Sequence, residues 1–121
     1  MVKALFDTNI LIDYLNGVEQ AQAELARFSD KAISMVTWME VMVGATRETD
    51  TTIRHFLASF VNIAVDSEIG ELAVILRQKH QIKLPDAVVW ATAQAHNRIL
   101  VTRNTKDFSA SEPGIRIPYL L

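Results

Sequence analysis

Short apolar runs alternate with longer segments of helical periodicity along this chain. The apolar runs predict β-strands at residues 2–6, 32–35, 61–65, 99–102 and 115–118. Apolar positions at helical spacing predict helices at residues 9–15, 18–28, 37–45, 51–60 and 67–80, and a further helix opens at residues 83–86. This alternation is typical of an α/β fold, in which helices cover both faces of a mostly parallel central sheet of 4–5 strands. The last strand has proline neighbours, so we expect it at an edge of the sheet.

Local signals predict where three of the helices begin. Thr37 and Glu40 have the spacing of a capping box, and Ser67 is a candidate N-cap. Pro85 and Asp86 suit the first turn of a helix, because proline has no backbone N–H to lose there and an acidic side chain complements the helix dipole. The alanine-rich segment that follows Pro85 is apolar nearly all round, which predicts a central, buried helix.

Composition limits the class of protein. The chain has 121 residues, of which 50% are hydrophobic and 21% charged, so we expect a single folded domain over residues 1–121. It has no cysteine, which excludes a disulfide framework, a zinc–cysteine site and a thiol nucleophile. We expect no signal peptide and no membrane segment, and hence a cytoplasmic location. The net charge of −2 means that nucleic acid would be bound through a local basic patch or through metal ions.

Four acidic residues lie at the ends of predicted strands or at the starts of predicted helices. Asp7 comes directly after the first strand, Glu40 and Asp86 lie in the expected first turns of two helices, and Asp107 follows the fourth strand. Each acid by itself is also explained as a turn or cap residue. Because the carboxyl ends of parallel strands share one edge of the sheet, however, we expect all four side chains to meet there.

Clustered carboxylates favour one kind of chemistry. They repel one another and raise one another's pKa values unless a cation lies between them. Oxygen ligands of this kind prefer Mg²⁺ or Mn²⁺. Such an ion can hold phosphate oxygens and activate water, so the pattern predicts metal-assisted hydrolysis of a phosphodiester.

Four short motifs together resemble those of the PIN-domain ribonucleases, and more narrowly the VapC-type toxins of bacterial toxin–antitoxin pairs. The motifs are LFDTN at residues 5–9, EVMVG at 40–44, LPDA at 84–87 and VTRNTKDF at 101–108. The resemblance spans nearly the whole chain. It implies a PIN-like three-layer sandwich, which agrees with the fold that the hydrophobic pattern predicts.

The resemblance also assigns roles to residues at these positions. It implies three core metal-binding acids: Asp7, Glu40 and Asp86. Asp107 is the expected fourth acid, and Asn104 is an expected polar partner at a position where relatives often carry aspartate. Which of the two fills the fourth role stays open, and with it the choice between one and two metal ions. Asn9 and Thr102 match polar positions that orient the acids or contact phosphate.

Basic and apolar residues near the motifs suggest contacts with partners. Arg103 and Lys106 flank Asp107, and they either contact RNA phosphates or are solvated loop charges. Relatives bind their antitoxin in a groove along the early helices, which here implies Leu11, Leu15 and Met42. Three histidines lie on predicted helices away from the strand ends, so we expect no catalytic histidine; they are His55, His80 and His96.

The function that the resemblance implies is a metal-dependent endoribonuclease toxin that hydrolyses RNA phosphodiester bonds. A cognate antitoxin would inhibit it. The chain would form a homodimer, and a heterotetramer or larger assembly with the antitoxin. Two alternatives remain: a catalytically silent PIN-like binding module, and a receiver-like signalling domain with an acidic edge.

Overall fold

Five parallel strands form one sheet in the computed structural model, which describes residues 2–121. The strands are β1 (Ala4–Phe6), β2 (Lys31–Ser34), β3 (Val61–Ile63), β4 (Ile99–Val101) and β5 (Ile115–Arg116). Their order across the sheet is β3-β2-β1-β4-β5, and every pair is parallel. β5 therefore lies at an edge, as the sequence predicts.

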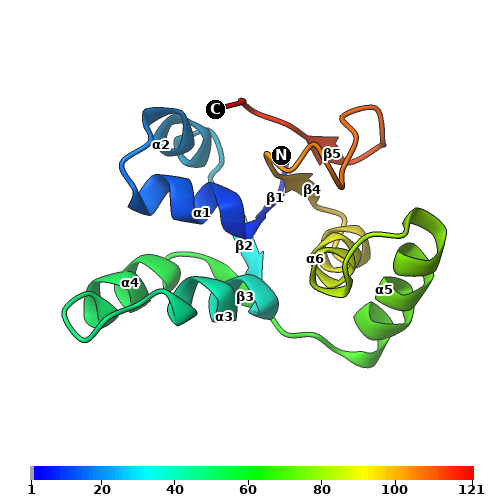
Figure 1. Cartoon of the computed structure of the whole chain (residues 1–121), viewed down its shortest axis with the longest axis horizontal. Coiled ribbons are helices and arrows are strands. Elements are labelled where there is room, and N and C mark those ends of the chain that lie inside the picture. Colours follow the sequence, from blue (N-terminus) through cyan, green and yellow to red (C-terminus); the bar gives the residue numbers. More distant parts are fainter. Residues whose placement is uncertain (1) are drawn as a thin grey trace.

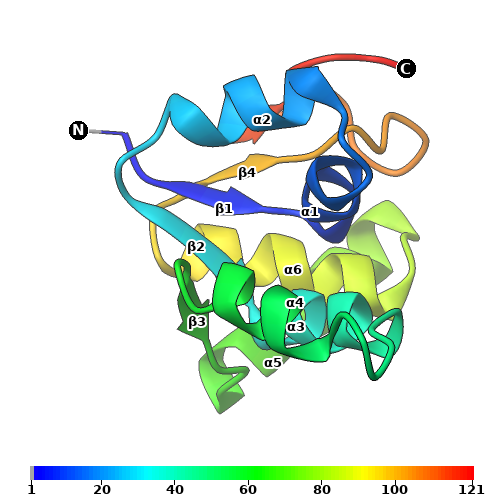
Figure 2. The same ribbon diagram turned by 90° about the vertical axis from the view of Figure 1, so that its left-hand side faces the viewer.

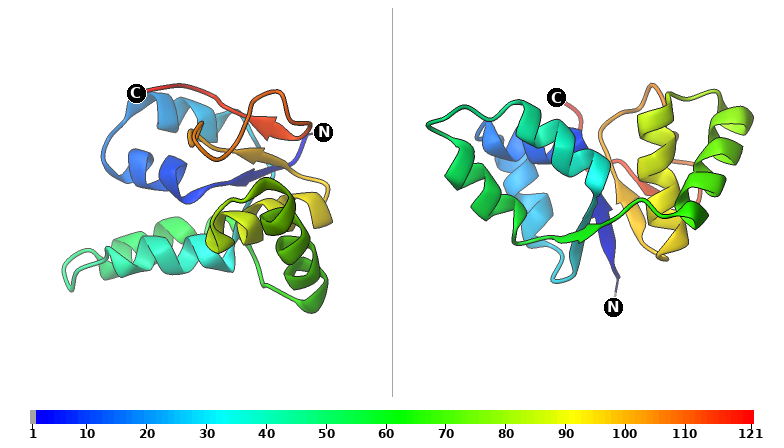
Figure 3. Two further views of the ribbon diagram at one scale, coloured as in Figure 1. Left: turned by 45° about the vertical axis from the view of Figure 1, so that its right-hand side comes forward. Right: turned by 90° about the horizontal axis from the view of Figure 1, so that it is seen from below.

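Six helices connect the strands: α1 (Thr8–Leu15), α2 (Glu19–Ala26), α3 (Met35–Val43), α4 (Asp50–Leu57), α5 (Ser67–His80) and α6 (Leu84–Ala95). The sheet separates α5 and α6 from the other helices, which gives three layers (Figures 1 and 3). The predicted α/β sandwich is therefore confirmed. The strand and helix bounds differ from the predicted ones by a few residues.

The alternation of side chains along the short strands builds two cores. Leu5, Ala32 and Leu100 point to the face covered by α5 and α6, where they pack in one apolar cluster. Phe6 and Ile33 point to the opposite face and pack with α1, α3 and α4. The alanine-rich helix α6 is buried along most of its length, as predicted, because its small side chains let it lie close to the sheet.

Two of the predicted helix caps are wrong. α3 begins at Met35, and its N-cap is Ser34, whose hydroxyl accepts a hydrogen bond from the Val36 N–H. Thr37 lies inside the helix, so the expected capping box does not form, and Glu40 lies in the second turn. The N-cap of α5 is Asp66, one residue before the expected Ser67.

The chain order creates a switch point between β1 and β4. From β1 the chain winds outward through β2 to β3, and α5 and α6 then return it to β4 on the other side of β1 (Figures 1 and 2). The two strands at which the winding direction reverses are neighbours, with Phe6 opposite Val101. Ligands of open α/β sheets bind at the carboxyl ends of such strands.

Candidate active site

Asp7 stands at the switch point and is held by the backbone on both sides. Its N–H donates to the carbonyl of Val101, at 2.9 Å, which ties it to the end of β4. Its carboxylate is the N-cap of α1 and accepts from the Thr8 N–H at 2.8 Å. The residue is only 4% exposed. Asp7 is therefore held in place at the junction of β1, β4 and the start of α1.

Two predicted supporting residues contact the second carboxylate oxygen of Asp7. The Thr102 hydroxyl donates to Oδ2 at 2.8 Å, and the Asn9 amide donates to the same oxygen at 3.3 Å. Asn104 acts one step further out, since its backbone N–H donates to the Thr102 hydroxyl at 3.1 Å. Burial is the main cause that raises the pKa of Asp7, and these hydrogen bonds oppose it by stabilising the charged form.

Asp86 lies in the first turn of α6 and interacts with the other three acids. Burial is the largest cause that raises its pKa, to about 6. The charges of Asp7, Asp107 and Glu40 raise it further, as does a hydrogen bond with Asp107. The structure thus brings all four predicted acids to one edge of the sheet.

Asp107 is positioned by its own loop and by α6. The Asn104 side-chain amide donates to Asp107 Oδ2 at 3.0 Å, and the Asp107 N–H donates back to Asn104 Oδ1 at 3.2 Å. The next residue, Phe108, is buried and packs edge-to-face on Trp90 of α6, with ring centroids 5.5 Å apart. The loop that carries Asp107 is therefore anchored to the helix that carries Asp86. In this arrangement Asn104 is a hydrogen-bond partner of Asp107 on both its side chain and its backbone.

Glu40 reaches the site from the exposed face of α3. The Thr8 hydroxyl donates to Glu40 Oε1 at 2.6 Å and also lies 3.0 Å from the hydroxyl of the buried Thr37. Sequence reasoning missed the role of Thr8, although it stands between Asp7 and Asn9 in the first motif. Its contact connects the first and third helices at the site.

The donor set fits a hard divalent cation. It consists of carboxylate oxygens whose mutual repulsion a cation would relieve. Within residues 2–121, no three acidic or histidine side chains already stand together as a metal-binding group. Repulsion between ionised carboxylates favours such spread positions. Binding would therefore require the carboxylates to move closer together; of the four, Glu40 is exposed and Asp86 is half-buried.

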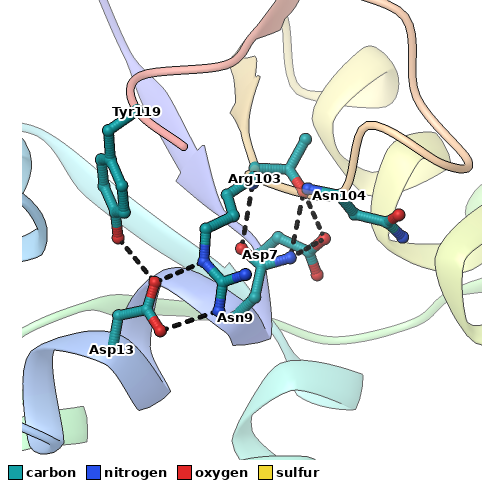
Figure 4. Close-up of polar contacts among 7 residues, drawn as sticks. Asp7, Asn9, Asp13, Arg103, Asn104 and Tyr119 are labelled. Carbon is teal, nitrogen blue, oxygen red and sulfur yellow. Dashed lines mark hydrogen bonds and ion pairs between the residues drawn. The ribbon is translucent and has the colours of Figure 1, made fainter. Parts of the chain in front are cut away.

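Arg103 does not face the acids. Its guanidinium forms an ion pair with Asp13, with Nε and Nη2 donating at 2.6 and 2.9 Å (Figure 4). Lys106 is exposed beside Asp107 and is the freer of the two predicted phosphate contacts. Of the three histidines, His55 lies on α4, His80 is the last residue of α5, and His96 is the C-cap of α6. The His80 ring packs against Trp90, with ring centroids 4.7 Å apart.

A groove of about 310 Å³ lies beside the acidic edge, between α1, α3 and α4. Ile12, Leu15 and Ile53 line it, and Glu40 belongs to its wall. Leu15 is thus available to a partner, as predicted. Leu11 is not available to a partner, because it is fully buried in the core. Met42 is partly buried and packs against the same core.

A larger cavity, of about 570 Å³, lies at the opposite edge of the sheet, away from the acids. Ile99, at the start of β4, and Arg116 of β5 help to line it. No helix within residues 2–121 has the length and apolar character needed to cross a membrane.

Comparisons with known proteins give one family model and several solved structures that match this chain. A family model described as PIN domain matches residues 4–111. The chain is similar to the structure of a toxin–antitoxin complex from Klebsiella pneumoniae, with 47% identity over 98% of this chain and 100% of the matched chain, and a TM-score of 0.94. No curated protein sequence matches it significantly.

Two further structures share the fold at lower identity. FitAcB from Neisseria gonorrhoeae is 22% identical over 98% of this chain and 99% of the matched chain, with a TM-score of 0.81. DNA-bound VapBC from Salmonella typhimurium is 22% identical over 97% of both chains, with a TM-score of 0.77.

Proposed function

Because the chain belongs to the PIN-domain family of nucleases, we propose that it is a metal-dependent endoribonuclease and the toxin of a toxin–antitoxin pair. One observation carries the proposal. Asp86 interacts with Asp7, Asp107 and Glu40 at the switch point of the sheet. Carboxylates from four separate parts of the chain lie near enough there for three of them to raise the pKa of the fourth, and general stability does not require such a cluster.

Asp7, Glu40, Asp86 and Asp107 would hold Mg²⁺ or Mn²⁺. When bound, the ion supplies Lewis acidity toward the phosphate oxygens and toward the attacking water. Asp7 contributes a carboxylate that is already fixed by Thr102, Asn9 and the start of α1. The Thr8 hydroxyl orients Glu40. Lys106 is placed to attract a phosphate of the RNA, while Arg103 is engaged by Asp13.

The inhibitory partner would be a cognate antitoxin. The basis is the 47% identity to a chain of a toxin–antitoxin complex, together with the apolar groove beside Glu40. An apolar segment of the antitoxin would bury Ile12 and Leu15 there, next to the acids that it must block. We place the pair in the cytoplasm and treat residues 1–121 as one PIN domain.

Assembly would begin with a homodimer, and the antitoxin would extend it to a heterotetramer or larger. Val74 and Ile75 on α5 are apolar and more than half exposed, on the side of the molecule away from the groove. Neighbouring exposed apolar side chains of this kind favour an interface between protein copies.

The test is cleavage of RNA by the purified chain with Mg²⁺ or Mn²⁺, repeated with a chelator and with single-stranded DNA of the same sequence. We expect internal cleavage of RNA that the chelator abolishes and that the co-purified antitoxin suppresses. A silent binding module or a receiver-like domain would leave the RNA intact. Intact RNA across a set of tRNA, rRNA and mRNA substrates would therefore contradict the nuclease assignment.

A further inference from the structure

Two buried carboxylates lie outside the acidic edge, Asp13 and Glu24, and the first of them contacts the loop after β4. Asp13, on α1, is 5% exposed and accepts three hydrogen bonds. Two come from the Arg103 guanidinium at 2.6 and 2.9 Å, and one comes from the Tyr119 hydroxyl at 2.9 Å (Figure 4). Three segments that are far apart in the sequence are joined there: the first helix, the loop after β4, and the C-terminal segment.

Arg103 stands between two residues of the candidate active site. Thr102 precedes it and donates to Asp7, and Asn104 follows it and donates to Asp107. The backbone N–H of Arg103 itself donates to Asn9 Oδ1 at 3.1 Å. The side chain and the backbone of this one residue therefore both tie the loop to α1.

The loop is anchored at its two ends by different means. At its start the ion pair with Asp13 fixes residues 102–104 against α1. At its end the buried Phe108 fixes the loop against Trp90 of α6. Asp107 lies between these anchors, so its distance from Asp7 depends on both.

We propose that Asp13, Arg103 and Tyr119 form a clamp that positions the loop carrying Asn104 and Asp107 opposite Asp7. This inference rests on the proposed function of the same edge, and it makes Arg103 a positioning residue. Arg103 does not contact the RNA. Release of its guanidinium to bind a phosphate would leave the buried Asp13 charge without its cation and with only the Tyr119 hydroxyl as a partner, which is unfavourable.

The chain offers a matched control. Arg116 forms the same kind of bidentate ion pair with the buried Glu24, at 2.6 and 3.0 Å, and its side chain is 36% exposed against 33% for Arg103. The side chains of that pair join β5 to α2. The contact of Arg116 with the loop of residues 102–108 runs through its backbone carbonyl, which accepts from the Thr102 N–H at 3.0 Å and is kept in Arg116→Ala. Arg103→Ala and Arg116→Ala therefore remove similar interactions, and only the first removes the clamp.

The experiment compares wild type, Arg103→Ala, Arg103→Lys, Tyr119→Phe and Arg116→Ala. Calorimetry measures Mn²⁺ affinity, hydrogen exchange measures protection of the Asn104 and Asp107 amides without metal, and kinetics separate kcat from KM for RNA. We expect Arg103→Ala to weaken Mn²⁺ binding roughly 10-fold, as loss of a supporting contact at a metal site does. Amide exchange should accelerate and kcat should fall, with KM unchanged. Arg116→Ala should resemble the wild type in all three.

We expect Tyr119→Phe and Arg103→Lys to change Mn²⁺ affinity, amide exchange and kcat in the same direction but by less. If Arg103→Ala does not fold, these two variants are compared with the wild type in its place. A raised KM with a shallower salt dependence and unchanged Mn²⁺ affinity would make Arg103 a phosphate contact and overturn the clamp. Equal losses in Arg103→Ala and Arg116→Ala would reduce it to general stability. If the wild type neither binds Mn²⁺ nor cleaves RNA, the proposed function fails, whereas faster exchange in Arg103→Ala alone would still support the clamp.

Discussion

At the scale of single residues, Asp86 carries a free-energy cost that comes first from burial and then from the three neighbouring carboxylates. Its pKa in the folded chain is about 6, against 3.8 for an ordinary aspartate. The folded state therefore binds a proton more tightly than the unfolded state does, and this group destabilises the fold as the pH rises from the lower to the higher pKa. The penalty is absent below the lower value and fully present above the higher one.

Asp86→Asn removes this penalty. In metal-free protein we expect the variant to be more stable than the wild type by about 1 to 2 kcal/mol near pH 7, with most of the gain lost near pH 4. The figure lies below the full linkage value because solvent screens a half-buried carboxylate. Urea unfolding at both pH values measures it. A variant that is less stable than the wild type at neutral pH would mean that burial and the neighbouring acids do not penalise the Asp86 charge in the folded chain.

Thr102 has the opposite role, because its hydroxyl satisfies buried polar groups. It donates to Asp7 and accepts from the Asn9 amide and the Asn104 N–H. Thr102→Val keeps the shape and removes one hydrogen bond from each of these three partners, so we expect a loss of about 2 kcal/mol in the free energy of unfolding. Thr92→Val is the control, since Thr92 is equally buried and donates only to the Val88 carbonyl of its own helix. Similar losses in the two variants would argue against a special role for Thr102.

The residues that the sequence predicts are those whose role follows from their place along the chain. Asp7 and Asp86 stand at a strand end and a helix start, which is enough to bring them to the shared edge. Thr8 and Asp13 were missed because their partners lie far away in sequence: Glu40 is 32 residues from Thr8, and Arg103 is 90 from Asp13. Asp13 did leave one signal, since it is a charged residue on the otherwise apolar buried face of α1.

At the scale of helices and strands, periodicity predicts the type of each element better than its first residue. The capping box at Thr37 matched a known spacing, but Ser34 stands three residues earlier and caps the helix. The strand β2 ends at Ser34, so the chain enters the helix without a loop. A spacing rule cannot detect that, because it depends on where the sheet pairing stops.

The start of α5 allows a direct test of the observed cap. The Asp66 carboxylate accepts from the Ile69 N–H at 2.9 Å, whereas Ser67 is the first residue of the helix. We expect Asp66→Ala to cost about 1 kcal/mol, from the lost cap and the lost charge at the positive end of the helix. Ser67→Ala should change the stability by less than about 0.5 kcal/mol. Thermal unfolding distinguishes the two variants. A larger loss of stability in Ser67→Ala than in Asp66→Ala would mean that Ser67 is the N-cap, as the sequence predicts.

At the scale of the whole molecule, the alternating pattern was sufficient to predict three layers and a parallel sheet. It was not sufficient to predict the partner surfaces. Leu11 was expected in the groove because relatives bind their antitoxin along the early helices, but it fills the core, while Leu15 lines the groove together with Ile12. Which side of a short helix faces the core depends on the crossing of α1 and α3, and that requires the three-dimensional structure.

The exposed pair on α5 gives a prediction about assembly. If Val74 and Ile75 belong to a dimer interface, Ile75→Glu should shift the free chain from dimer to monomer, because a charge would be buried there without a partner. Val2→Glu is the control, as Val2 is 59% exposed and lies outside this face. Sedimentation at micromolar concentrations measures both. A wild type that is strictly monomeric would contradict the dimer.

The central claim is that the carboxylates around Asp86 form one metal-dependent nuclease site, and the most direct test is single-turnover cleavage of RNA by wild type, Asp86→Asn and Asp66→Asn. Asp66→Asn removes the same charge at a helix cap that asparagine can also fill, outside the acidic edge. We expect wild type and Asp66→Asn to cleave equally and only with Mg²⁺ or Mn²⁺, while Asp86→Asn loses at least about 100-fold in rate, as removal of a key stabilising group at an active site does. Cleavage by Asp86→Asn at the wild-type rate, or cleavage that persists unchanged in the presence of a chelator, would contradict the account.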